Sequence, residues 1–436
     1  MKLTTPDLKT NMARMKTLVF TAVESGFDMS TVPHGGSAPV CAFLMDEWRK
    51  RPPFDIRMAS VALLGNDAPD ERDFFRYTPK QHADFMFKFE QAVTQEILRH
   101  DPRETVVLCN GVSDGPRFKF LANKGYSVFA IFHMNMVSFF TGVFLKNLIR
   151  PETTVALYRV VSHSWLKFIL PDVLKLIFVK EEESVIYCKG VIVPSEGMRR
   201  QLLRMYPDAA AERIHVVPWG AETITFDERQ TQGKVEALRR KYKIRDDEAV
   251  LITLSRVSPE KGHDRLLKAL ELWEASDEYP KSGVCVLICG VAGYTHAKPF
   301  EKKIIAAANR LKKTRVIFPG YVHGADKHAH FRLSDLYVFP SRYEAYGLTL
   351  MEAFAAGLPA VATFSDGTEQ IMRSDFGELI PAVAEREVPR RLKDAIQRML
   401  SDREKLRAMG QAAKKFADEQ PFSKAADRIA EIMSRP

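Results

Sequence analysis

Short runs of Val, Ile, Leu and Phe recur along the chain, and longer segments with helical spacing separate them. The runs show little polar alternation, which is the pattern of parallel strands buried on both faces. Strands are predicted at 18–22, 56–64, 105–109, 127–133, 191–194, 214–217, 250–255, 284–289, 315–318, 336–339 and 359–363. Helices are predicted at 81–100, 197–205, 263–275, 299–311 and 348–356.

The alternation of strand and helix occurs twice, once in each half of the chain. Alternating βα units form parallel sheets with helices on both faces. We therefore expect an α/β protein with two Rossmann-like, doubly wound domains, at 1–225 and 226–420, facing each other across a cleft. Ligands of such sheets bind at the carboxyl ends of the strands. Pro421 interrupts the helical pattern, and 421–436 is predicted to form a last helix that packs back toward the first domain.

Composition agrees with a folded protein of more than one domain. The chain has 436 residues, which is too long for one ordinary core. Hydrophobic residues make up 46% and charged residues 27%, as in globular proteins, which argues against a largely disordered or fibrous protein. The net charge of +9 suits an anionic partner such as a nucleotide diphosphate, a phosphorylated acceptor, an acidic membrane surface or nucleic acid. A basic soluble enzyme fits equally well.

The five cysteines and the start of the chain bear on location. The cysteines form no CxxC pair, and most lie in apolar runs, where cysteine behaves as a small hydrophobe. An odd count without a disulfide framework favours a reducing compartment, so we predict a cytoplasmic protein. The apolar run at 18–23 is too short for a signal-peptide core, and no stretch approaches the ~20 apolar residues of a membrane span. Any membrane contact is expected to be peripheral, on the inner face.

The clearest candidate chemistry lies in the run PSRYEAYGLTLMEAFAAGLPAVAT. Gly347 lets the backbone approach a ligand closely. The amides of Leu348 and Thr349 at the following helix start can face a phosphate. Glu352, one turn into the helix, can accept hydrogen bonds from a ribose diol, whereas Glu344 precedes the helix and lies closer to a sugar ring. From the spacing alone, the two acids could instead serve only the helix dipole.

A second run, LSRVSPEKGHDRLLKAL, reads as strand, loop and helix. Arg256 and Lys261 flank its loop. Two cations at a strand end suit a departing diphosphate, because negative charge builds on it as the glycosidic bond breaks. Taken alone, an arginine and a lysine in a loop are usually solvated charges.

Together the two runs resemble retaining glycosyltransferases of family 4, which have the two-domain GT-B architecture. The first run carries the E-x7-E signature of that family, and the second resembles its R-x4-K element, whose cations contact the donor diphosphate. The first run also looks like the corresponding stretch of sucrose synthases and sucrose-phosphate synthases. The resemblance covers the whole second half and is patchy in the first, which suggests a common donor and an acceptor specific to each enzyme.

The resemblance implies a set of site residues. Catalytic roles fall to His133, Arg256, Lys261 and Glu344. Donor contacts are expected from Gly35, Gly36, Arg256, Lys261, Tyr321, Val322, Glu344, Ala345, Tyr346, Gly347, Leu348, Thr349 and Glu352.

Three further matches to the family are incomplete. His133 ends a strand where the family often has His-Asp, but Met134 follows it here. Thr368 takes the place of the second glycine in the family's Gly-Gly-x-x-Glu. Basic residues on one predicted helix could meet a phosphorylated or membrane-borne acceptor, or they could form a solvated face. They are Arg199, Arg200 and Arg204.

The function expected from the resemblance is transfer of a sugar, with retention, from a nucleotide diphosphate donor that we expect to be UDP-linked. It implies front-face attack by the acceptor hydroxyl, whose proton passes to a phosphate oxygen of the leaving group. No DxD cluster or His/Cys ligand spacing occurs, so no metal or other cofactor is expected. The acceptor could be a small molecule, a glycan or a lipid-linked glycan. Two alternatives stay open: a UDP-sugar epimerase on a GT-B-like fold, and a basic protein that binds membranes or nucleic acid, although no nucleic-acid partner is expected.

One apolar run, LKFILPDVLKLIFVK at 166–180, matches nothing in the family. It could form a membrane-contacting surface. We favour a buried helix interrupted by Pro171.

Overall fold

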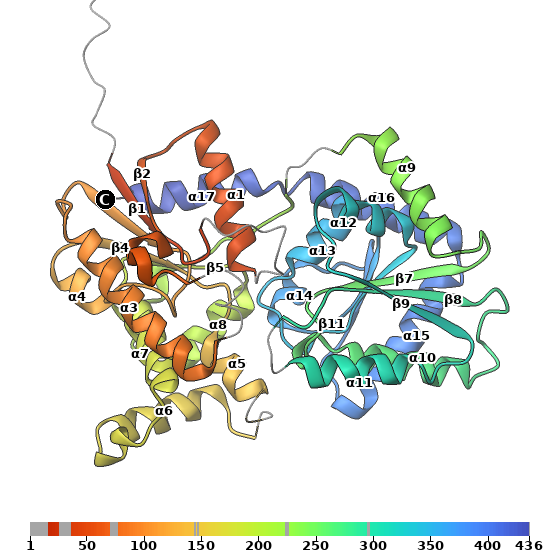
Figure 1. Ribbon diagram of the computed structural model, residues 1–436, viewed down its shortest axis with the longest axis horizontal. Coiled ribbons are helices and arrows are strands. Elements are labelled where there is room, and N and C mark those ends of the chain that lie inside the picture. Colours follow the sequence, from red (N-terminus) through yellow and green to blue (C-terminus); the bar gives the residue numbers. More distant parts are fainter. Residues whose placement is uncertain are drawn as a thin grey trace, which may run out of the picture.

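Each half of the chain builds one parallel six-stranded sheet with helices on both faces (Figure 1). The structure is a computed structural model and describes residues 16–25, 36–69, 77–143, 145, 148–222, 226–293 and 297–435. This is the α/β architecture of two Rossmann-like domains that the alternation of strands and helices predicts. No helix in these ranges is both long and apolar enough to span a membrane.

The first sheet has the strand order β2-β1-β3-β4-β5-β6. Strands β3 and β5 are buried along their whole length, which explains their unbroken apolar sequences. The strands are β1 (Thr17–Thr21), β2 (Asp55–Ala59), β3 (Thr105–Cys109), β4 (Ser127–Ile131), β5 (Gly190–Val193) and β6 (Ile214–Val216). The helices are α1 (Ser37–Lys50), η1 (Val61–Asp67), α3 (Pro79–Ile97), α4 (Phe118–Asn123), α5 (Met136–Val143), α6 (Pro151–Ser162), η2 (Trp165–Phe168), α7 (Asp172–Tyr187), α8 (Glu196–Met205) and η3 (Ala211–Arg213).

The second sheet has the order β12-β11-β10-β7-β8-β9. Its strands are β7 (Ala249–Leu254), β8 (Val284–Cys289), β9 (Thr314–Gly320), β10 (Leu336–Phe339), β11 (Ala360–Thr363) and β12 (Gly377–Ile380). The helices are α9 (Glu228–Lys241), η4 (Pro259–Lys261), α10 (His263–Glu274), α11 (Lys298–Ala308), α12 (Gly324–Leu333), α13 (Leu348–Ala355), α14 (Asp366–Ile371), η6 (Glu385–Glu387), α15 (Val388–Leu400), α16 (Arg403–Asp418) and α17 (Phe422–Ser434).

The strand order places one topological switch point in each domain. In the first sheet β1 lies between β2 and β3, and in the second β7 lies between β10 and β8, so consecutive units are added on opposite sides. Ligands of open α/β sheets bind at such points, at the carboxyl ends of the strands. The segments that follow β1, β3, β7 and β10 are therefore where a site is expected.

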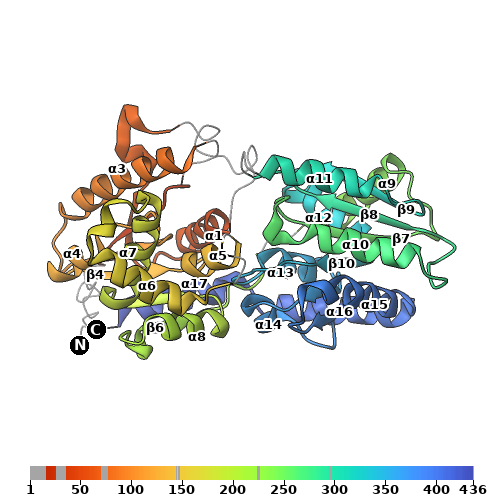
Figure 2. The same ribbon diagram turned by 90° about the horizontal axis from the view of Figure 1, so that it is seen from below.

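The chain crosses the domain boundary twice, and the two crossings lie side by side. The amide of Ala221 donates to the Gln420 carbonyl at 2.7 Å, and that of Phe422 donates to the Ala221 carbonyl at 2.8 Å. Beyond this contact α17 lies on α1 of the first domain, and the Trp48 indole donates to the Ala426 carbonyl at 3.3 Å (Figures 1 and 2).

Two predicted elements differ from the structure. The strand predicted at 56–64 ends at Ala59, because the Ser60 side chain accepts from the Ala62 amide and starts the 3-10 helix η1. The helix predicted at 166–180 is buried only after Pro171, where α7 begins. Before the proline the chain forms η2, and Phe168 and Ile169 are exposed, so the prediction of a buried segment was wrong there.

Candidate active site at the domain boundary

The two runs singled out in the sequence meet through an ion pair. Lys261 ends η4, and Glu344 lies in the loop between β10 and α13. The Lys261 ammonium lies 2.5 Å from Oε1 of Glu344, and the Ser341 hydroxyl donates to the same oxygen at 3.0 Å. Both partners of the ion pair are largely buried. The loops that leave β7 and β10 are therefore joined at the switch point of the second sheet.

Arg256 lies in the same loop as Lys261, next to another carboxylate. Its guanidinium is 3.7 Å from Glu260, which also accepts from the Ser258 hydroxyl at 2.5 Å. Burial raises the pKa of Glu260, but Arg256, the Ser258 bond and Lys261 together lower it below its ordinary value. A Cβ on Gly293 would lie 2.6 Å from Cδ of Arg256, so a glycine is needed there for the arginine to lie where it does.

Helix α13 begins without a side-chain cap. Its N-cap residue Gly347 has φ 107° and ψ 59°, a backbone conformation that favours glycine. The first amides of the helix, at Leu348 and Thr349, carry the positive end of the helix dipole. Gly36, which begins α1, is close by, since a Cβ built on it would lie 4.0 Å from Cδ1 of Leu348. Helix starts from both domains thus converge; Gly35 lies outside the described residues.

Glu352 is paired with a lysine that sequence reasoning missed. The ammonium of Lys327, on α12, lies 2.7 Å from Oε1 of Glu352. Glu222 is a third member of this group: burial raises its pKa to about 7, and Glu352 adds to that rise while Lys327 opposes it. Lys327 occurs in the run GADKHAHF, which has no recognisable chemical pattern, so only the fold reveals the pairing.

His133 lies just beyond β4 and is held by a side chain that follows the neighbouring strand β3. Its Nε2 is 3.2 Å from the Asn110 amide oxygen, and its ring lies 5.8 Å from that of Trp219. Burial lowers the pKa of His133 to about 4, outweighing the contact with Asn110, so the ring is neutral near pH 7. The Asn110 amide also donates to the Ser37 carbonyl at 3.0 Å and ties this histidine to the start of α1.

A carboxyl group at the end of β1 was also missed by sequence reasoning. Glu24 contacts the Ser37 hydroxyl, which donates to it at 2.6 Å. Burial raises the pKa of Glu24 to about 7; the Ser37 bond opposes the rise, the buried Asp114 adds to it, and Arg256 of the other domain lowers it. The signal in the sequence was weak, because an acid that follows a first strand is usually a solvated turn residue.

The other predicted donor contacts occupy varied positions. The Tyr346 hydroxyl accepts from the Gly220 amide at 3.0 Å and its ring is buried, so this side chain stabilises the boundary. The Thr349 hydroxyl accepts from Tyr337 at 2.8 Å. The remaining three side chains are partly buried. The Tyr321 ring lies against the His323 ring, and Val322 and Ala345 pack against the hydrophobic cores.

The three arginines considered for the acceptor are engaged in contacts. Arg199 donates to two backbone carbonyls of its own domain. Arg204 lies 3.3 Å from Glu152 on α6. Arg200 reaches across the boundary to Glu369 on α14, at 2.8 Å. These contacts stabilise α8 and the packing of the two domains, and a role in acceptor binding stays a prediction.

Thr368 has a structural reason to replace the glycine of the family motif. Its hydroxyl and the Ser365 side chain form a capping box at the start of α14. The hydroxyl accepts from the Ser365 amide at 2.7 Å and donates to the Thr363 carbonyl at 2.8 Å. The loop after β11 is therefore fixed by side-chain hydrogen bonds.

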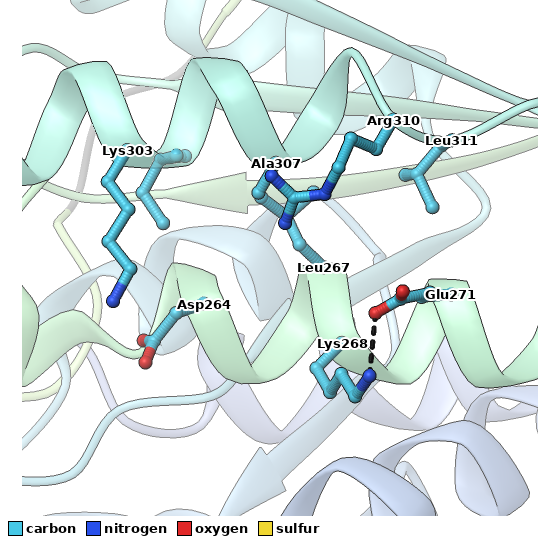
Figure 3. A pocket seen from close by; sticks show the side chains of 9 residues that line it. Asp264, Leu267, Lys268, Glu271, Lys303, Ala307, Arg310 and Leu311 are labelled. Atoms are coloured by element: carbon cyan, nitrogen blue, oxygen red, sulfur yellow. Dashed lines mark hydrogen bonds and ion pairs between the residues drawn. The ribbon is translucent and has the colours of Figure 1, made fainter.

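A hollow of about 170 Å³ lies between α10 and α11, away from these residues (Figure 3). Charged side chains edge it, including the Lys268–Glu271 pair at 2.8 Å. None of the predicted site residues lines it. Within the described ranges, no group of three or more His, Cys, Asp or Glu residues is arranged to hold a metal ion.

Two parallel-sheet domains whose switch points meet at one boundary define the GT-B architecture. The chain superposes on Anabaena HepE in complex with UDP and glucose with a TM-score of 0.65 and 18% identity, over 96% of this chain and 99% of that one. It superposes on sucrose-phosphate synthase from Thermosynechococcus elongatus with a TM-score of 0.68 and 16% identity, over 95% and 98%. At these identities the likeness shows the fold.

The second domain is similar to a known family. Residues 234–416 match the model of the glycosyl transferases group 1. The chain is 28% identical over 180 residues to the alpha-monoglucosyldiacylglycerol synthase of Acholeplasma laidlawii, covering 41% of this chain and 42% of that protein. It is 28% identical over 255 residues to the alpha-D-kanosaminyltransferase of Streptomyces kanamyceticus, covering 58% and 62%. The chain spans about half the length of the curated relatives it matches.

Proposed function

We propose that the protein transfers a sugar from a nucleoside diphosphate sugar, UDP-linked, to an acceptor hydroxyl, with retention at the anomeric carbon and without a metal ion. The observation that carries the proposal is the Lys261–Glu344 pair beside the uncapped start of α13. It places a cation next to a helix dipole, and both stabilise an anion. The complexes of HepE with UDP and UDP-glucose support the choice of base.

The leaving diphosphate would lie between the loop after β7 and the start of α13. Arg256 and Lys261 would neutralise the charge that builds on it, and the amides of Leu348 and Thr349 would donate to its oxygens. Positive side chains and amides then do the work that a divalent ion does in other enzymes. A carboxylate at Glu352 would accept from the ribose hydroxyls.

The sugar and acceptor would lie toward the first domain. Glu344 and the neutral ring of His133 are the groups expected near the sugar. The acceptor hydroxyl would attack the face from which the diphosphate leaves, and a phosphate oxygen would take its proton. The acceptor itself is proposed only as a class, a glycan or lipid that carries a free hydroxyl, because several relatives are named for lipid substrates.

Thermal shift and product analysis test the proposal. We expect UDP to raise the melting temperature more than GDP or ADP does. UDP-[¹⁴C]glucose offered with an acceptor library should give a labelled product whose anomeric proton has the α coupling, equally with and without EDTA. Interconversion of UDP-sugars without an acceptor would identify an epimerase and overturn the proposal.

A further inference from the structure

A cluster of apolar side chains is exposed on α6 and the turn that follows it. Leu157 and Val160 on α6 are 53% and 69% exposed, and in and after η2 the values are 73% for Trp165, 78% for Phe168 and 71% for Ile169. We call these five residues the α6–η2 surface. Scattered exposed apolar residues are ordinary, whereas a contiguous group with two aromatic rings marks an interaction surface. Figure 1 shows α6 at the lower edge of the first domain, on its outside.

The segment that carries this surface has a small excess of basic residues. From 148 to 170 the sequence has three basic residues and one acidic residue, and the whole chain carries +9. Helix α8 packs against α6 and adds Arg200 and Arg204, whose side chains are more than half exposed although each is paired with one carboxylate, Glu369 and Glu152 respectively. Apolar and aromatic side chains beside cations are complementary to an anionic bilayer, whose headgroups attract the cations while its acyl chains accept the rings. A second copy of this chain would bring the same positive charge to the contact, which disfavours self-association.

We infer that the α6–η2 surface docks on the surface of an anionic phospholipid bilayer. Trp165 and Phe168 enter the interfacial layer, where aromatic side chains are favoured. This docking is a binding event that does not depend on the proposed transfer reaction.

The surface is connected to the candidate active site by one short helix. Helix α5 begins three residues after His133 and packs against α6. Its start is fixed by the buried Glu181, which accepts from the amides of Met136 at 2.9 Å and Val137 at 3.3 Å. A bilayer on the α6–η2 surface would therefore lie at a fixed distance from the end of β4.

The tryptophans give a direct test. Trp48, Trp219 and Trp273 are only 2–3% exposed, so Trp165 is the one tryptophan of the four that can respond to lipid. Vesicles of phosphatidylcholine with phosphatidylglycerol should shift the emission of the protein to shorter wavelength, and brominated acyl chains should quench it. Pure phosphatidylcholine vesicles should have less effect. Trp165→Phe should abolish the shift.

A matched pair of variants distinguishes docking through this surface from non-specific hydrophobic adsorption to vesicles. Phe168→Ser/Ile169→Ser should reduce co-flotation with phosphatidylglycerol vesicles about tenfold or more. Leu272→Ser/Ile305→Ser, which removes two exposed apolar side chains from α10 and α11, should float as the wild type does. Unchanged melting temperatures would show that both variants are folded. The inference is overturned if the wild type does not float, if the first variant floats equally, or if sedimentation shows a dimer that only the first variant loses.

Discussion

The ammonium of Lys261 lies 2.5 Å from the carboxylate of Glu344, 83 residues further along the chain. The ion pair holds the Lys261 ammonium against a carboxylate that we expect to contact the donor sugar. In the proposed reaction it would couple the group that neutralises the leaving diphosphate to the group that orients the sugar.

The first prediction concerns this pair. Lys261→Ala should lower kcat by about 10²–10³, because it removes a cation from the charge that develops on the diphosphate. Lys261→Arg should retain part of the activity. The measurement is transfer from UDP-glucose at saturating donor. Full activity in Lys261→Ala, with an unchanged melting temperature, would exclude Lys261 from the leaving-group site.

The second prediction concerns Glu352 and Lys327, which lie 2.7 Å apart. Glu352→Ala should abolish measurable transfer, and Glu352→Gln should weaken UDP binding about tenfold or more, since hydrogen bonds to a charged group are lost. Lys327→Gln should weaken it less, because it frees the carboxylate without removing it. Calorimetric titration of UDP checks the order. Equal affinity in Glu352→Gln and the wild type would contradict the assigned ribose contact.

The third prediction compares two glycines at helix starts. Gly347→Ala should destabilise the fold by about 1–3 kcal/mol, because φ 107° is strained for alanine, and it should also lower activity. Gly36→Ala should be tolerated, since its φ is −63° and an added Cβ would be only in ordinary contact with Leu348. Melting temperatures of the two variants measure the difference. A larger loss of melting temperature in Gly36→Ala than in Gly347→Ala would contradict this prediction.

The fourth prediction concerns pH. Burial lowers the pKa of His263 from 6.5 to about 4, so between these pH values the unfolded chain binds a proton that the folded chain does not. The contribution of His263 to the free energy of unfolding should therefore fall as pH drops from 6.5 to 4, by up to about 3 kcal/mol.

Urea unfolding at pH 7 and pH 4.5 would measure this loss. His263→Gln should lose less stability than the wild type over the same interval. His163→Gln, which changes an exposed histidine, should behave as the wild type does. Identical pH profiles in all three proteins would show that His263 does not control the loss.

Most strands were predictable because they are buried on both faces, and burial leaves an apolar run in the sequence. Strand β8 is an example, with all six residues buried. Strand β12 was missed because GELI is short, holds a glutamate and is only half-buried. Strand β2 was predicted too long because the four residues after Ser60, VALL, are apolar. In the structure Ser60 caps a 3-10 helix there.

In the site, local runs predicted the residues that lie near each other in the sequence. Arg256 and Lys261 stood out because both follow one strand. Lys327 and Asn110 could not be predicted, since each lies beside Glu352 or His133 only once distant parts of the chain have folded together. The exposure of Phe168 was equally hidden, because an apolar run reads the same whether it meets a core or a surface.

The contact between α17 and α1 has a consequence for the order of folding. Trp48 is buried in the first domain, and its indole bonds to Ala426, near the end of the chain. During synthesis this face of the first domain stays uncovered until the whole second domain has been made. The first domain to emerge is thus the last to be completed, and a nascent chain would expose α1 to chaperones for most of its synthesis.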